Sequence, residues 1–214
     1  MKTKLSLTSF ALLASCSLPA VAQSAFTLPA QSLNQLTVSG ISTEIDFDGS
    51  ANQTAFDGSG ARAEVKLQWQ NDWYVGLAGE FLETRDDSVD LFSDELTAGI
   101  GTHYVLNANT RFFSELLVHR LTIETEGGDT RSEDQDTGPG IKLGIAHQAQ
   151  TNLTLFASAR YSRLTREVRY WQTELGAFYM FNPSTALGLS YQRRTASETD
   201  YRQDSYLFNV HFWF

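Results

Sequence analysis

The sequence has almost no cysteine and no long apolar run outside its first 22 residues. Its one cysteine, Cys16, lies in that N-terminal stretch, so removal of the stretch would leave a chain without thiols. Such a chain can have neither a disulfide framework nor a thiolate nucleophile. The lack of 18 consecutive apolar residues excludes a transmembrane helix in the rest of the chain. It does not exclude a transmembrane barrel, because barrel strands are only half apolar.

Positive charge is also scarce. The 214 residues carry 16 basic and 25 acidic side chains, a formal net charge of −9. Loss of Lys2 and Lys4 with the N-terminal stretch leaves 14 basic side chains and a net charge of −11. Such an acidic chain repels the phosphates of nucleic acids, so we expect no nucleic-acid partner.

The N-terminal stretch, 1–22, has the pattern of a secretory signal peptide. Its features are a positive start at Lys2 and Lys4, an apolar stretch over 5–18 and the small-residue cleavage site Ala20-Val21-Ala22. We expect cleavage after Ala22, although Leu13–Cys16 also resembles a lipobox, which would leave an acylated Cys16. Residues 23–34 are polar and contain Pro29, so we expect them to form a short N-terminal tail.

Ten segments alternate apolar and polar residues with the period of two that indicates a half-buried β-strand. Their approximate bounds are 35–46, 60–70, 73–84, 95–105, 110–123, 138–148, 153–163, 169–181, 186–195 and 204–214. Most have the ~9–11 residues that a tilted strand needs to cross a bilayer. The clearest segment alternates Ala61, Ala63, Val65, Leu67 and Trp69 with Arg62, Glu64, Lys66 and Gln68.

Two of the ten segments have a less regular pattern. The segment 35–46 changes phase around Gly40, which suggests a β-bulge at that position. The segment 110–123 is apolar on both faces at Phe112–Phe113 and again over 116–118. If the first segment and another weak one do not span, the count falls from ten strands to eight.

The connections between these segments alternate in length. The short ones are 71–72, 106–109, 149–152 and 182–185, and the long ones are 47–59, 85–94, 124–137, 164–168 and 196–203. Short turns at one end and longer loops at the other are typical of an antiparallel up-and-down transmembrane barrel. A soluble β-sandwich buries its apolar faces in pairs and needs no such asymmetry. The pattern therefore favours an all-β barrel over 35–214.

The long connections hold the acidic excess of the chain, with 15 acidic and four basic side chains. Clusters such as Asp86–Asp87 and Glu133–Asp134 offer the oxygen ligands that Ca²⁺ prefers, but no loop has a complete EF-hand spacing. We therefore expect a solvated acidic surface at this end and no specific metal site.

The last ten residues form the strand that identifies the class of barrel. Its apolar face consists of Tyr206, Phe208, Val210, Phe212 and Phe214. A strand of this kind, ending in Phe, resembles the C-terminal strand of bacterial outer-membrane β-barrels. The resemblance implies that these five residues are an assembly signal, read by the barrel-assembly machinery.

After its signal peptide, the whole chain resembles the small outer-membrane barrels of the OmpA/OmpX and opacity type. The resemblance implies residence in the bacterial outer membrane, with the short turns and both termini in the periplasm. It also implies contact with lipid and lipopolysaccharide, and with periplasmic chaperones during biogenesis. We expect no cofactor, and a monomer.

The phase of the strands directs a set of charged side chains into the barrel lumen. They are Arg62, Glu64, Lys66, Glu80, Glu95, Arg111, Glu115, Lys142, Arg160, Glu174 and Arg194. A lone charge in a narrow barrel is unfavourable, so these groups are expected to pair. They form either a salt-bridged network that fills the barrel or the wall of a pore that orients a polar solute.

The width of the barrel bears on this choice. Eight strands leave room only for side chains or one small ligand, and ten lie near that limit. Glycines on the inward face remove bulk, however, and leave room for a narrow passage. They are Gly76, Gly99, Gly101, Gly144, Gly176 and Gly188.

The four histidines give no sign of an enzyme. The barrel lipid A deacylases use a His-x-Ser pair, but here His103, His119, His147 and His211 are followed two positions later by Val105, Leu121, Ala149 and Trp213. Glu115 and His119 share a strand face about 13 Å apart, too far for a direct hydrogen bond. The omptin proteases have longer chains with barrels that rise well above the membrane, so no catalytic residue is expected.

Two functions remain after these exclusions. The first is a narrow pore or structural membrane protein, which the charged lumen and the inward glycines favour. The second is a surface adhesion or ligand-recognition protein that uses its acidic extracellular loops. The loops are short for a large protein interface, which weakens the second hypothesis.

Overall fold

The computed structural model describes residues 34–47, 55–70, 72–85, 90–127, 130–165, 168–197 and 201–214. The signal peptide predicted over 1–22, with Cys16, lies outside the described residues. The tail predicted over 23–34 also lies outside them, except for Asn34. No helix within the described ranges is long and apolar enough to cross a membrane.

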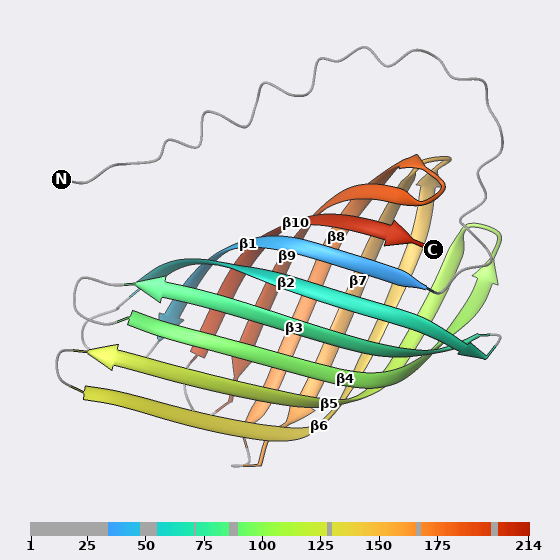
Figure 1. Ribbon diagram of the computed structural model, residues 1–214. Helices are drawn as coiled ribbons and strands as arrows, with labels where there is room; N and C mark the ends of the chain where they lie inside the picture. Colours follow the sequence, from blue (N-terminus) through green and yellow to red (C-terminus); the bar gives the residue numbers. More distant parts are fainter. Residues whose placement is uncertain are drawn as a thin grey trace, which may run out of the picture.

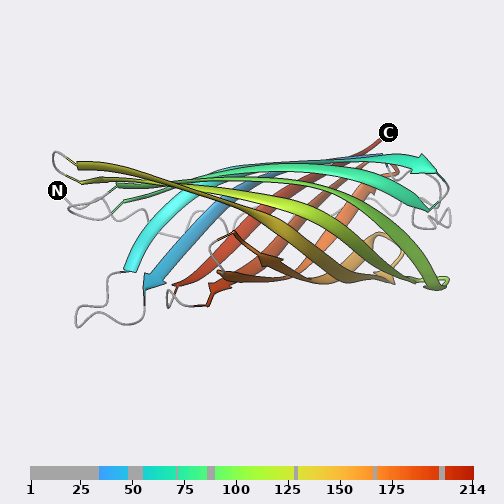
Figure 2. The same ribbon diagram turned by 90° about the horizontal axis from the view of Figure 1, so that it is seen from below.

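Ten antiparallel strands close into one barrel, which confirms the predicted fold and count (Figure 1). They are β1 (Gln35–Phe47), β2 (Ala55–Gln70), β3 (Trp73–Arg85), β4 (Asp90–Asn107), β5 (Thr110–Gly127), β6 (Thr130–Gln150), β7 (Leu153–Arg163), β8 (Arg169–Asn182), β9 (Thr185–Ala196) and β10 (Tyr201–Trp213). Figure 2 shows the strands of the near and far walls crossing obliquely, as tilted barrel strands do.

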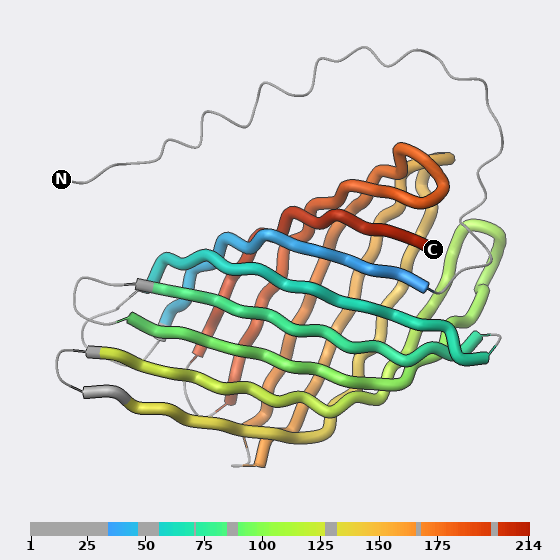
Figure 3. Tube along the Cα trace, viewed as in Figure 1, coloured from blue at the N-terminus to red at the C-terminus, as the bar shows by residue number. Residues whose placement is uncertain are grey.

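Each strand pairs with its neighbours in the sequence, and β1 pairs with β10 to close the ring (Figure 3). The closing ladder runs without interruption from Gln35↔Trp213 to Phe47↔Tyr201. The strand that carries the C-terminal aromatic residues therefore completes the barrel. Closure leaves no sheet edge unpaired at mid-height, as a lipid environment requires.

The structure corrects the predicted lengths of several strands. The stretch 124–137, predicted as a long loop, is largely strand, because β5 and β6 pair as far as Gly127↔Thr130. The stretches 85–94 and 196–203 are likewise partly strand, since β4 starts at Asp90 and β10 at Tyr201. Alternation marks only the part of a strand that has lipid on one side, so a polar extension of the ladder resembles a loop in the sequence.

The predicted bulge at Gly40 is wrong. The register of β1 with both neighbours is continuous through Gly40. The phase is ambiguous for another reason: Ile41 and Ile45 are buried in the interior, while Ser42 and Glu44 face outward. The register shifts lie beside the short turns, at Gln68/Gln70, Val105/Asn107, Gln148/Gln150 and Met180/Asn182.

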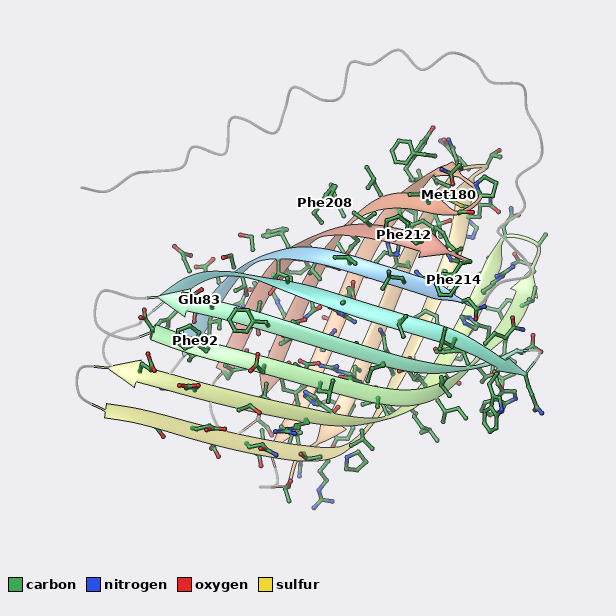
Figure 4. The ribbon with its side chains drawn as sticks, viewed as in Figure 1. Glu83, Phe92, Met180, Phe208, Phe212 and Phe214 are labelled. Atoms are coloured by element: carbon green, nitrogen blue, oxygen red, sulfur yellow. The ribbon has the colours of Figure 1, made fainter. Side chains whose placement is uncertain are left out.

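The outer face of the barrel is apolar and aromatic. Its most exposed large side chains are Trp69, Tyr104, Val105, Leu106, Leu116, Leu175, Phe181, Leu189, Tyr206 and Phe214. Figure 4 shows Phe208 and Phe212 on β10 and Phe214 directly after it, and each is at least 40 % exposed. Large apolar side chains lie outside and polar ones inside, the reverse of the arrangement in a water-soluble protein. This arrangement fits a protein surrounded by lipid.

Candidate functional site

The lumen holds all eleven charged side chains that the strand phase assigns to it. Seven of them are at most 9 % exposed: Glu80, Glu95, Glu115, Lys142, Arg160, Glu174 and Arg194. The other four, Arg62, Glu64, Lys66 and Arg111, are half-buried. They come from β2 to β9, so the closing of the barrel brings together groups from most of the chain.

Four of these residues form an ion-paired layer in the outer half of the lumen: Glu80, Glu95, Arg160 and Arg194. Arg194 donates two hydrogen bonds to the Glu80 carboxylate, one of them 2.6 Å long from Nη2 to Oε2. Arg194 Nη2 also lies 3.6 Å from Glu95 Oε2, and Arg160 Nη1 lies 2.6 Å from Glu95 Oε1. Glu95 on β4 and Arg194 on β9 belong to strands that face each other in the ring, so the pairs cross the lumen.

Two further buried side chains, His119 and Tyr170, pack against this layer. Tyr170 donates a hydrogen bond of 3.4 Å from its hydroxyl to Glu95 Oε2, and its ring lies 5.0 Å from that of His119. His119 Nε2 is 3.6 Å from Glu95 Oε2. We did not predict a role for either residue, although His119 lies on the strand face of Glu115, and Tyr170 on that of Glu174.

A second group of ion pairs lies nearer the short-turn end. Glu64 accepts contacts of 2.9 Å from both Arg62 and Lys66. Arg62 also lies 3.9 Å from Glu174, whose carboxylate accepts a hydrogen bond of 2.9 Å from Ser190. Arg62 and Glu174 lie on β2 and β8, so this group also spans the barrel.

Among the described residues, three of the predicted lumen charges are not brought into an ion pair: Arg111, Glu115 and Lys142. Among the described residues, neither Lys142 nor Arg111 has an acidic group within 4.0 Å of its cationic nitrogens. Glu115 stands directly opposite Lys142 in the β5–β6 register, but its carboxylate accepts a hydrogen bond of 3.2 Å from Tyr74. Arg111, Glu115 and Lys142 therefore lie outside the two ion-paired groups of the lumen.

Aromatic rings occupy the space beside three of the six inward glycines. A Cβ at Gly101 would lie 2.3 Å from the Tyr74 ring, and one at Gly144 would lie 2.2 Å from the Phe113 ring. At Gly176 the corresponding neighbour is the Phe156 ring at 2.6 Å. These three glycines make room for bulky neighbours, whereas a Cβ at Gly76 would have no atom nearer than 3.5 Å.

The two halves of the lumen differ in how they are filled. The outer half contains the ion-paired layer and a buried apolar cluster of Ile41, Leu82 and Leu207. The void beside the layer has a volume of only about 20 Å³. The half nearer the short turns contains a cavity of about 190 Å³, which we call the vestibule. Its lining extends from Lys142 and Glu174 at mid-height to Arg111 and Trp213 at the short-turn end.

Three of the histidines lie near the short-turn end: His103, His147 and His211. His211 is buried in the lumen, where its Nδ1 lies 3.0 Å from both Gln35 Nε2 and Thr37 Oγ1. His147 faces outward beside a turn, with its Nδ1 3.0 Å from Thr110 Oγ1.

The comparisons with known proteins agree on the class of fold. The sequence matches the family described as outer membrane protein beta-barrel domain over residues 8–214. No curated protein matches the sequence significantly.

Several solved barrels are similar to this structure at low sequence identity. The NanC porin has a TM-score of 0.51 at 11% identity, covering 83% of this chain and 98% of its own. The translocator domain of the autotransporter NalP from Neisseria meningitidis has a TM-score of 0.50 at 12% identity, covering 86% and 89%. The beta domain of the Bordetella autotransporter BrkA has a TM-score of 0.50 at 13% identity, covering 86% and 100%. At these identities the likeness is one of fold alone.

Proposed function

The chain belongs to the outer membrane protein β-barrel family, and from this premise we propose that it is a structural barrel whose lumen is sealed against solute flow. Membership of this family places the protein in the bacterial outer membrane, in a pore or structural role. The side chains that fill the outer half of the lumen support a structural barrel over an open pore.

The observation that carries this proposal is the ion-paired layer. Its pairs join β3 and β4 to β7 and β9 across the lumen, and its members are at most 9 % exposed. Opening a passage here would separate buried charges from their partners, which is strongly unfavourable. The apolar cluster of Ile41, Leu82 and Leu207 adds a second obstacle in the same half.

The proposal extends to the protein's surroundings. The apolar outer face fits direct contact with lipid and, at the long-loop end, with lipopolysaccharide. The exposed aromatic residues of β10 suit recognition by the barrel-assembly machinery, after periplasmic chaperones deliver a chain whose signal peptide has been cleaved after Ala22. The account assigns the protein no catalytic activity, cofactor or nucleic-acid partner, and it describes a monomer.

Liposome swelling tests the sealed lumen. Liposomes containing refolded protein are diluted into an isotonic solution of a small sugar, and a conducting barrel lets the sugar enter and the vesicles swell. We expect no swelling above that of empty liposomes, with the NanC porin as the conducting control. Swelling at a rate near that of the control would contradict the proposal.

The second candidate, surface recognition, is favoured by one feature of the outer rim. Among the described residues, β6 pairs with β7 only from Gly140↔Ser162, so its outer part has β5 as its one strand partner. Glu133 and Asp134 are exposed on this part. An outer strand segment that has one strand partner among the described residues and carries the exposed Glu133 can receive a strand or a basic segment of another protein.

Adherence of bacteria that carry the protein tests this second candidate. The double substitution Glu133→Ser and Asp134→Ser should reduce adherence to host cells while the level of folded barrel stays constant. Substitution of Asn107 and Asn109 by serine at a short turn is the matched control. Unchanged adherence in the first variant would rule out a role for this edge.

A further inference from the structure

We propose that the vestibule is a binding site for a small organic monoanion with a flat apolar body, of which an aromatic carboxylate is the simplest example. The ligand would bind from the periplasmic side, where the vestibule reaches the ends of the strands. The carboxylate would bind near Lys142, and the ring would lie between the aromatic side chains of the wall. The inference is independent of whether the outer half of the lumen conducts.

The charges that line the vestibule do not balance. The cationic residues are Arg62, Lys66, Arg111 and Lys142, and the acidic ones are Glu64 and Glu174. Both acidic groups already contact Arg62, and Glu64 contacts Lys66 as well. The lining therefore carries two more cations than acidic groups, with Glu115 behind it as a further acidic neighbour of Lys142, and this excess favours an anion.

Lys142 is the strongest single argument for a ligand. Its side chain lines the vestibule and the residue is only 9 % exposed, yet among the described residues it has neither a hydrogen bond nor an ion pair. A buried ammonium group without a partner is strongly unfavourable. Glu115, its neighbour across the β5–β6 ladder, is engaged by Tyr74 and lies outside the vestibule lining. A bound carboxylate would supply the missing partner.

Arg111 places a second cation at the mouth. It is opposite Ala146 in the β5–β6 register, four residues along β6 from Lys142. Four residues of a strand span about 13 Å, so the two cations stand at different depths of the same wall. Arg111 can attract an anion to the mouth, and Lys142 can hold it at mid-height.

The remaining wall is apolar and suits a ring. Phe113, Phe156 and Phe178 line the vestibule from β5, β7 and β8. Its volume of about 190 Å³ exceeds the roughly 150 Å³ of an apolar cavity known to hold benzene. A single aromatic ring with a carboxylate is therefore a reasonable upper size for the ligand.

A polar atom of the wall also lacks a partner. His211 lines the vestibule, and its Nε2 is buried without a hydrogen bond among the described residues. Its ring lies 5.1 Å from that of Phe178. With Nδ1 accepting from Gln35 or Thr37, Nε2 would carry the proton and could donate to a ligand.

Fluorine NMR with 4-fluorobenzoate tests the proposal directly. The protein is placed in phosphatidylcholine nanodiscs, so that no anionic lipid competes, and empty nanodiscs give the background. We expect saturable binding of 4-fluorobenzoate, and at least tenfold weaker binding of the neutral 4-fluorobenzyl alcohol and of the cationic 4-fluorobenzylamine. Equal binding of all three compounds, or no saturable binding of the carboxylate, would overturn the proposal.

Two variants locate the site. Lys142→Met keeps the side-chain volume and removes the charge, so the dissociation constant for 4-fluorobenzoate should rise about tenfold or more. Arg169→Gln removes a cation from the opposite rim, where the side chain is exposed, and should leave the dissociation constant unchanged.

Heat-modifiable migration on gels shows whether each variant is folded. If Lys142→Met does not fold, Arg111→Gln at the half-buried mouth replaces it, with an expected several-fold rise. A folded Lys142→Met or Arg111→Gln barrel that binds the carboxylate as tightly as the wild type would refute the site.

Discussion

Arg194 on β9 lies 3.6 Å from Glu95 on β4, although these two strands stand on opposite sides of the ring. The contact therefore ties two walls of the barrel together through the lumen. Glu80 and Arg160 add further pairs at the same level, so each charge of the layer has an opposite charge beside it. The same side chains that fill the lumen also hold its walls in place, and the sealing of the barrel and its stability have a common origin.

The ion pair of Glu80 and Arg194 should be strongly coupled. Glu80→Gln removes the carboxylate charge and one of the two acceptors beside the buried Arg194, and should lower the free energy of unfolding by about 3 kcal/mol. The double variant Glu80→Leu with Arg194→Met should recover much of this loss, because no unpaired charge remains at the pair. Urea unfolding in detergent measures both.

Arg193 provides the matched control for this experiment. It is adjacent to Arg194 but points outward, pairs with Asp204 at 2.8 Å and has a side chain 44% exposed. Arg193→Met should therefore change the free energy of unfolding by no more than about 1 kcal/mol. If Glu80→Gln and Arg193→Met lower the free energy of unfolding by similar amounts, the buried lumen pair contributes no more to stability than the exposed pair.

The packing of Phe113 against Gly144 predicts a second effect on stability. A Cβ at Gly144 would lie 2.2 Å from the Phe113 ring, so Gly144→Ala should reduce the free energy of unfolding by about 1–3 kcal/mol. Gly40 faces outward with nothing within 4 Å of such a Cβ, and Gly40→Ala should be close to neutral. Combining Gly144→Ala with Phe113→Leu should restore part of the loss. A neutral Gly144→Ala variant would contradict this packing.

The C-terminal aromatic face should affect assembly more than stability. Phe214→Ser is expected to reduce the amount of barrel in the outer membrane of cells several-fold, while the purified protein refolds in detergent much as the wild type does. Leu189→Ser removes a similarly exposed apolar side chain, 67% exposed against 63% for Phe214, from a strand outside the signal. Equal defects in the two variants would show that lost lipid contact, and not recognition, is responsible.

The fold could be predicted from the sequence because lipid on one face imposes strict alternation on each strand. That alternation also places the lumen charges, since Arg62, Glu64 and Lys66 occupy every second position of one strand. It fails where the ladder leaves the membrane, as in the outer parts of β5 and β6, because water on both faces imposes no pattern there.

The contacts inside the lumen could not be predicted in this way. The phase of a strand shows which side chains point inward, but not which cation meets which carboxylate across the barrel. The engagement of Glu115 by Tyr74 in place of Lys142 depends on the glycines that let the aromatic rings into the lumen. The vestibule depends on these contacts between side chains, so no pattern in the sequence predicts it.

Single-channel conductance in planar bilayers tests the sealed lumen most directly. Refolded wild-type protein is inserted at high salt and compared with a double variant, Glu95→Ser with Arg194→Ser, that removes one contact across the barrel. The account predicts no current steps from the wild type and frequent openings from the double variant. Steady, ion-selective steps from the wild type, with selectivity altered in Lys66→Glu, would show an open pore and contradict the account.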